Sequence, residues 1–174
     1  MKRKIAIVGP ESSGKSTLTI ELAEELGASY IGEYAREYID HLSRSVNFED
    51  LADIAIGQKK REEQAFSEAR TMLFCDSTQL TNVIWSYDKF RKCDPWIESE
   101  FKNEHYDLYL LCKPDLAWIP DTQRTDEHRR EYLFEQYVHK LKEQKKPYKI
   151  VEGQGRRRID IAKQYIIELI ENGN

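Results

Sequence analysis

The chain has 174 residues, of which 40% are hydrophobic and 33% are charged. This length fits one domain of ordinary size with a sizeable core, so we expect residues 1–174 to form a single domain. Lys and Arg number 27 against 31 Asp and Glu, which gives a net charge of −4 and argues against a nucleic-acid-binding protein.

The three cysteines, Cys75, Cys93 and Cys112, are an odd number and lack metal-ligand spacing, which favours a reduced, cytoplasmic setting. The basic start, Met1-Lys2-Arg3-Lys4, precedes an apolar run too short for a signal peptide. No stretch approaches the length of a membrane span. We therefore expect a soluble, cytoplasmic protein without a membrane partner.

The first element is a β-branched apolar run at residues 4–8, which predicts a buried parallel strand. The segment GPESSGKST at residues 9–17 follows and fits G-x-x-x-x-G-K-[ST], the P-loop. Leu18, Leu22 and Leu26 then predict one face of a helix that Gly27 caps. Strand, glycine loop and helix start together predict phosphate binding, so we expect ATP to contact Gly9, Glu11, Ser12, Ser13, Gly14, Lys15, Ser16 and Thr17.

Two side chains of this loop have predicted chemical roles. Lys15 would reach the β- and γ-phosphates, and the Ser16 hydroxyl would bind Mg²⁺. ATP and Mg²⁺ are therefore the expected cofactors.

Strands and helices alternate along the rest of the chain. Asn47 is a plausible helix N-cap, with Asp50 in place of the glutamate of a capping box. The alternation predicts a three-layer α/β domain with a parallel sheet of about five strands. Further strands are expected at residues 28–32, 71–76, 107–112 and 148–152, and helices at 48–69, 79–90, 95–103, 126–144 and 159–172.

Ligands gather at the carboxyl ends of such strands. The third strand ends in Asp76, which we expect to hold Mg²⁺ together with Ser16. The alternative is a helix cap, because Asp76, Ser77 and Thr78 all suit that position, and both roles can coexist.

The second strand leads into a charged, aromatic segment that starts a helix or a loop. Glu33 could accept the proton of an attacking hydroxyl, and Arg36 could stabilise the transferred group or hold the acceptor. Tyr34 and Tyr38 could stack on a heterocycle. An amphipathic helix start with a local ion pair explains the same residues equally well.

The fourth strand is followed by a candidate lid at residues 113–125. It contains Trp118, Asp121 and Arg124, and mobile loops of this kind bring arginines over a migrating phosphoryl group. Arg129 and Arg130 fit solvated residues of a helix start at least as well. The later arginine run at residues 156–158 is interpreted mainly as a solvated basic surface.

These segments together resemble a known family. The residues that carry the likeness are GPESSGKSTL at 9–18, EYAREY at 33–38, FCDS at 74–77 and WIPD at 118–121 leading to Arg124. The chain resembles the ribosylnicotinamide kinase domain of NadR-type bacterial NAD-biosynthesis regulators, within the P-loop nucleoside and nucleotide kinases. The likeness covers nearly the whole chain.

The resemblance implies transfer of the γ-phosphoryl of ATP to the ribose 5′-hydroxyl of nicotinamide riboside, in NAD salvage. It implies cleft roles for Glu33, Arg36, Asp76, Trp118 and Arg124. Together with the motifs above, we expect catalytic roles for Lys15, Glu33, Arg36, Asp76 and Arg124, and a substrate site at Glu33, Tyr34, Arg36, Tyr38, Asp76, Trp118 and Asp121. Because Met1 lies only a few residues before the first strand, we expect the DNA-binding and adenylyltransferase domains of the full-length regulators to be missing.

The chain departs from the family at two positions. Thr78 stands where a second acid is usual, and the lid reads Asp121-Thr122-Gln123-Arg124 in place of Asp-Gly-x-Arg. Both departures affect the acceptor side, so a kinase for another nucleoside or a nucleoside monophosphate stays open, as does an ATPase without an acceptor. A GTPase is disfavoured because Cys112 stands where the base-reading asparagine should be.

Overall fold

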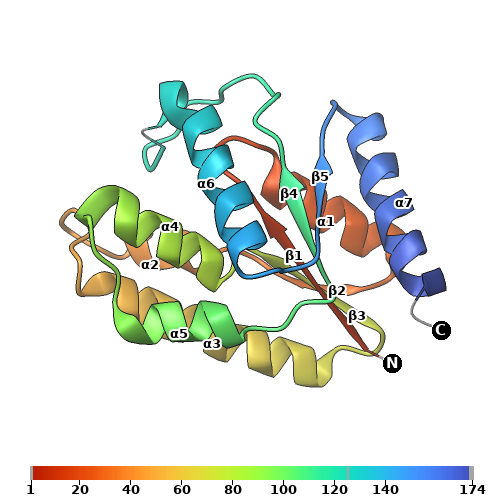
Figure 1. Ribbon diagram of the computed structural model, residues 1–174, viewed down its shortest axis with the longest axis horizontal. Helices are drawn as coiled ribbons and strands as arrows, with labels where there is room; N and C mark the ends of the chain where they lie inside the picture. Colours follow the sequence, from red (N-terminus) through yellow and green to blue (C-terminus); the bar gives the residue numbers. More distant parts are fainter. Residues whose placement is uncertain (1, 125, 173–174) are drawn as a thin grey trace.

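The computed structural model describes residues 2–124 and 126–172, which form an α/β fold (Figure 1). The strands are β1 (Arg3–Val8), β2 (Ser29–Ile31), β3 (Met72–Asp76), β4 (Leu108–Cys112) and β5 (Tyr148–Val151). The helices are α1 (Lys15–Leu26), α2 (Tyr34–Asp40), α3 (Asp50–Glu68), α4 (Gln79–Phe90), α5 (Pro95–Asn103), α6 (Arg130–Glu143) and α7 (Arg156–Asn172), with a 3-10 turn η1 (Glu127–Arg129).

The five strands form one parallel sheet in the order β2-β3-β1-β4-β5. The register aligns their carboxyl ends, since Ile7 lies beside Asp76 and Val8 beside Leu111. The segment that follows β1 therefore emerges at the centre of the sheet, between the ends of β3 and β4. The predicted parallel sheet of about five strands is confirmed.

Alternate residues of each strand face two separate layers of helices. Ile5 and Ile7 of β1 pack in a cluster with residues of α1 and α7. Ala6 and Val8 of the same strand face the opposite side, where α3, α4, α5 and α6 contribute to the second cluster. The period-two burial of strand residues thus produces the predicted three layers.

Helix boundaries differ from expectation at three places. The helix expected at 126–144 consists of η1 followed by α6, which begins only at Arg130. Asn47 and Asp50 form the reciprocal hydrogen bonds expected of a capping box, but α3 begins only at Asp50 and its N-cap residue is Glu49 instead of Asn47. Helix α7 begins at Arg156, earlier than the apolar pattern indicates, directly after Gly155 in a left-handed conformation. Arginine is a good helix former, so this polar first turn is physically reasonable.

Within residues 2–124 and 126–172, no helix combines the length and the apolar character needed to cross a bilayer.

Candidate active site

The loop between β1 and α1 has the backbone shape of a phosphate-binding turn. Gly9 and Gly14 have φ values of 144° and 79°, which side chains rarely adopt. A Cβ atom at Gly9 would also lie 2.7 Å from the carbonyl oxygen of Cys112. Both glycines are therefore required where the chain turns from the sheet into the N-terminus of α1.

Lys15 is held over this loop. Its Nζ atom donates a hydrogen bond to the carbonyl oxygen of Pro10 at 2.9 Å, and the Ser13 hydroxyl donates to the same oxygen at 2.8 Å. Lys15 also lines the main cavity of the molecule. Its positive charge thus lies beside the amides of the loop and the positive end of the α1 dipole, where an anion is favoured.

Ser16 and Asp76 meet below the loop. The Ser16 hydroxyl donates to Oδ2 of Asp76 at 2.6 Å, whereas Oδ1 of Asp76 is buried and accepts no hydrogen bond from the described residues. Burial raises the pKa of Asp76 above its usual range, opposed by the charge of Lys15. An unsatisfied, buried carboxylate oxygen beside a hydroxyl fits a bound cation.

Magnesium would suit this pair because it binds one or two protein oxygens and completes its shell with phosphate oxygens and water. In the part of the chain that the structure describes, no cluster of three or more His, Cys, Asp or Glu side chains could hold a metal alone. Ser16 and Asp76 would therefore hold the ion together with a phosphate ligand.

Glu33 comes from the turn between β2 and α2, and Arg36 from the first turn of α2. Both line the cavity, and no donor among the described residues bonds the Glu33 carboxylate. Desolvation raises the pKa of Glu33, and the charge of Asp76 adds to the rise while Lys15 opposes it. The Arg36 guanidinium donates from Nη2 to Oδ2 of Asp121 at 2.6 Å.

Gln58 connects the turns that carry the two acids. It is 3% exposed, its Oε1 accepts from the N–H of Tyr34 at 2.9 Å, and its Nε2 donates to the carbonyl of Ser77 at 3.4 Å. One amide from α3 therefore joins the residue after Glu33 to the residue after Asp76. The role of Gln58 was not predicted, since a polar residue on a predicted helix gives no sequence signal of its partners.

The segment after β4 lies against the P-loop and α2. The N–H of Ile119 donates to the Ser12 hydroxyl at 3.0 Å, and Arg130 donates to the carbonyl oxygens of Ser12 and Leu116. Arg124 lines the cavity, and its Nη1 bonds the carbonyl of Ile119 at 2.7 Å. The predicted lid thus covers the loop, although its last residue, Thr125, lies outside the described residues.

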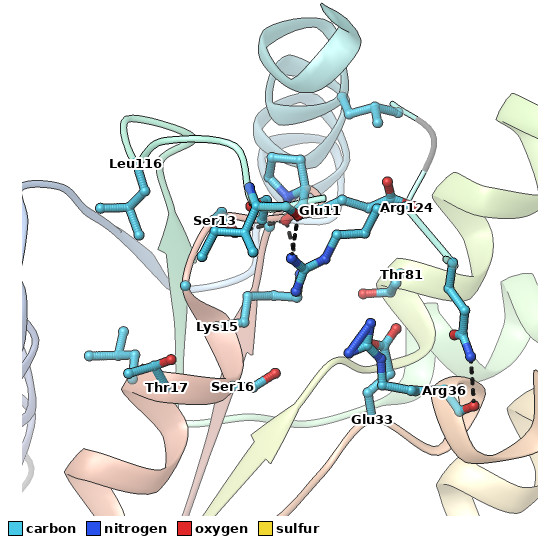
Figure 2. Close-up of a pocket in the computed structure, with 18 of the residues that line it drawn as sticks. Glu11, Ser13, Lys15, Ser16, Thr17, Glu33, Arg36, Thr81, Leu116 and Arg124 are labelled. Carbon is cyan, nitrogen blue, oxygen red and sulfur yellow. Dashed lines mark hydrogen bonds between the residues drawn. The ribbon is translucent and has the colours of Figure 1, made fainter. Parts of the chain in front are cut away.

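These segments enclose a cavity of about 300 Å³ at the carboxyl end of the sheet. Figure 2 shows Lys15 and Ser16 on one side, Glu33 and Arg36 on another, and Arg124 above them. Further side chains that line the cavity, most of them apolar or aromatic, come from α2, α4 and α6. They were not predicted from sequence: Ala35, Ile39, Thr81, Ile84, Trp85, Leu133 and Tyr137.

A helical period places Thr81, Ile84 and Trp85 on one face of α4, but it does not say which faces of which helices meet around a cavity. Tyr137 adds a polar atom there, because its hydroxyl donates to Oγ1 of Thr81 at 3.3 Å. Burial raises the pKa of Tyr137, so this hydroxyl stays neutral.

Five residues predicted to contact substrate do not line the cavity: Tyr34, Tyr38, Asp76, Trp118 and Asp121. The Tyr34 ring occupies the space beside Gly57, where a Cβ would lie 2.1 Å from Cε1 of the ring. The Tyr38 hydroxyl bonds Asp50 and Asp53. Trp118 lies beneath the Arg130 guanidinium, and Asp121 holds Arg36.

The arginine run is not a uniform solvated surface. Arg156 is exposed and pairs with Glu25 and Asp160, in agreement with that interpretation. Arg158 contradicts it, because it is 4% exposed and bonds the P-loop carbonyl of Ser13. Its partners come from loops that are distant in sequence, which explains why the pattern alone does not reveal its burial.

A family model described as an AAA domain matches residues 4–158. Trifunctional NAD biosynthesis/regulator proteins NadR from Salmonella typhimurium and Escherichia coli are each 28% identical over 127 residues, covering 71% of this chain and 31% of theirs. The chain thus spans about a third of the length of these curated relatives.

Solved structures show the same fold. A crystal structure of NadR protein in complex with NR superposes with a TM-score of 0.84 at 22% identity, over 97% of this chain and 51% of that one. Deoxyadenosine kinase from M. mycoides, with products dCMP and a flexible dCDP bound, gives 0.68 at 19% identity, over 95% and 99%. Thymidylate kinase from Ehrlichia chaffeensis gives 0.68 at 13%, over 97% and 98%.

The matches confirm the resemblance to NadR and the P-loop kinase-like fold. The P-loop itself implies that the chain binds ATP. The chain belongs to the AAA domain family and is homologous to NadR.

Proposed function

We propose that this chain is an ATP- and Mg²⁺-dependent kinase that phosphorylates the ribose 5′-hydroxyl of nicotinamide riboside, giving nicotinamide mononucleotide. The observation that carries the proposal is that Lys15 and Ser16 of the P-loop share one cavity with Glu33 and Arg36. A phosphate-binding end and a proton-accepting end thus lie within reach of a single pair of substrates.

The nucleotide would bind with its phosphates on the P-loop. The loop amides and Lys15 would bind the β- and γ-phosphates, with Ser16 and Asp76 as protein partners of Mg²⁺. Bound Mg²⁺ supplies charge neutralisation at the phosphates. Asp76 is ready for this role because its Oδ1 has no partner among the described residues.

The acceptor hydroxyl would attack the γ-phosphorus in line, the bond to the β-phosphate oxygen would break, and ADP would leave. Glu33 would take the hydroxyl proton, since its carboxylate lines the cavity and has no donor among the residues described. Arg36 and Arg124 would stabilise the negative charge on the transferred group.

The apolar and aromatic residues that line the cavity would contact a flat ring of the acceptor. Trp85, Ile84 and Tyr137 offer aromatic and aliphatic surface, and Thr81 and Tyr137 add neutral polar atoms. Thr78, one of the two departures from the family, does not line this cavity. It caps α4, where its side chain accepts from the N–H of Leu80 and bonds Glu104.

A kinase for a deoxynucleoside or a nucleoside monophosphate is the second candidate. It is favoured by the coverage of the structural matches, which extend over 98% and 99% of the thymidylate and deoxyadenosine kinases. An aromatic and neutral polar cavity end would also accept a nucleobase.

The test is phosphoryl transfer from MgATP to nicotinamide riboside, beside a panel of ribonucleosides, deoxynucleosides and monophosphates. We expect the highest kcat/KM with nicotinamide riboside and no transfer by Lys15→Ala. Preference for another acceptor would replace the substrate but keep the kinase. ATP hydrolysis without transfer to any acceptor would overturn the proposal.

A further inference from the structure

We propose that Arg158 is a positioning residue that keeps the P-loop in its phosphate-binding shape and ties it to the loops after β4 and β5. The inference rests on the proposed function only in that the P-loop binds a nucleotide. It concerns the arginine run at residues 156–158, to which the proposed phosphoryl-transfer mechanism assigns no role.

The contact with the P-loop fixes the orientation of one peptide group. Nη2 of Arg158 donates to the carbonyl oxygen of Ser13 at 2.8 Å. Because the C=O and N–H of a trans peptide point in opposite directions, the N–H of Gly14 faces away from Arg158. No residue of the described chain accepts a hydrogen bond from this N–H, which leaves it available for a phosphate oxygen.

The same guanidinium reaches two further loops. Nη2 also donates to the carbonyl of Lys113 at 2.9 Å, and Nη1 donates to the carbonyl of Gly153 and to Oδ1 of Asp115, both at 2.8 Å. The other oxygen of Asp115 accepts from the N–H of Gly153 at 2.7 Å. Arg158 therefore joins the P-loop, the base of the predicted lid and the loop before α7.

Because the Arg158 side chain is buried, the loss of any of its hydrogen bonds would leave a buried polar group without that partner. Arg158 is 4% exposed, and its Nε atom lies 3.7 Å from the position that a Cβ would take on Gly14. Removing the guanidinium would take this donor from three backbone carbonyls and from Oδ1 of Asp115. Lysine cannot replace it, because one ammonium cannot present donors in the planar fork that these four acceptors require.

Arg156 provides a matched control. It lies on the same helix two residues earlier and carries the same charge, but it is exposed and pairs with Glu25 and Asp160 at the surface. A general effect of lost positive charge near the site would appear in both variants, whereas a defect in P-loop shape would appear only at Arg158.

The experiment measures MgADP binding to the full chain by calorimetry for wild type, Arg158→Gln, Arg158→Lys and Arg156→Gln. We expect Kd to rise at least about tenfold in both Arg158 variants, since several charge-assisted hydrogen bonds are lost. Arg156→Gln should stay within about twofold of wild type. Unchanged affinity in Arg158→Gln would overturn the inference.

Two further measurements distinguish a positioning role of Arg158 from a general loss of protein structure. Millimolar guanidinium should restore MgADP binding in Arg158→Ala but not alter Arg156→Ala, and failure of this rescue in a folded Arg158→Ala protein would count against the inference. In a transfer assay, KM for ATP should rise more than KM for the acceptor, and equal rises would indicate general damage instead.

If the Arg158 variants do not fold, Asp115→Asn decides the question. It removes the ion pair but leaves an oxygen for the N–H of Gly153, so MgADP affinity should fall severalfold with a native melting curve, and unchanged affinity would overturn the inference. If wild type binds MgADP but transfers no phosphate, the proposed kinase fails while the role of Arg158 stands.

Discussion

Arg36 of α2 and Asp121 of the loop after β4 form an ion pair, with Nη2 and Oδ2 2.6 Å apart. The Arg36 side chain is 42% exposed and that of Asp121 28%. Gln123 strengthens the same junction, because its N–H donates to Asp121 and its side-chain amide donates to the carbonyl of Arg36. One wall of the cavity is thus fastened to the loop that covers the nucleotide end.

Asp121→Asn should lower kcat/KM about tenfold while hardly changing stability. Exposed ion pairs contribute only about 0–1 kcal/mol to folding, but Arg36 loses the partner that orients it in the cavity. Phosphoryl-transfer kinetics measure the change in kcat/KM, and thermal melting measures the change in stability. Glu37→Gln, which breaks the exposed pair with Arg61 between α2 and α3, is the control and should change neither. An activity loss of equal size in the control would contradict the prediction.

Glu33→Gln should lower kcat by about 10²- to 10⁴-fold without weakening ATP binding, as expected for loss of a general base. In wild type, burial raises the pKa of Glu33, so its carboxyl binds a proton at a higher pH than a free glutamate. The base works only when ionised, so kcat should fall as the pH drops through this raised pKa. A pH profile of kcat at saturating ATP measures this, and a glutamine variant with the same acid limb would exclude Glu33 as its source.

Gln58→Met should lower kcat more than it raises either KM. Methionine fills a similar volume, but it cannot bond both the N–H of Tyr34 and the carbonyl of Ser77, so the turns carrying Glu33 and Asp76 lose their link. Gln79→Met is the matched control. Gln79 is also buried and bonds the carbonyl of Ala55 in α3, but it does not touch the turn at Glu33. Equal kcat losses in the two variants would indicate a general packing effect.

In the Glu104→Gln variant, the free energy of unfolding should fall less as the pH rises than it does in wild type. Burial and the nearby charge of Glu62 raise the pKa of Glu104 to about 8, whereas the pKa of a free glutamate is about 4.3. Between these values the unfolded chain releases the proton and the folded chain keeps it, so wild-type stability falls as pH rises through this window and levels off above it.

Urea denaturation at pH 5 and pH 8 measures this difference. Glu104→Gln has no proton to release and should lose less stability between the two pH values. Glu100→Gln, on the helix that ends just before Glu104, should keep the wild-type dependence. An unchanged slope in Glu104→Gln would show that another group titrates.

Most strands and helices could be predicted from the sequence, because short β-branched runs and helical periodicity are patterns of residues that are close together in the chain. The run before Gly9 predicts β1 correctly, and Asn47 and Asp50 make the expected reciprocal hydrogen bonds, although Glu49 is the N-cap of α3. The order of strands was not predicted, because periodicity identifies a strand but not its neighbours.

The site was accessible only where the chemistry lies within one motif. Lys15 and Ser16 follow from the P-loop pattern, and the structure places both beside the cavity. Trp85, Tyr137 and Arg158 were missed because their positions depend on segments that meet only in three dimensions. Tyr34 shows the reverse case, since the space beside Gly57 that takes its ring is invisible in the sequence.

The central position of β1 separates two halves of the chain. Under the proposed function, β2, β3 and α4 on one side would serve mainly the acceptor, while β4, β5 and α7 on the other would serve the nucleotide. Selection can therefore alter acceptor choice through changes at residues such as Ile84 and Trp85 and leave nucleotide binding largely intact. Such a division makes one scaffold adaptable to many acceptors, with ATP as the constant partner.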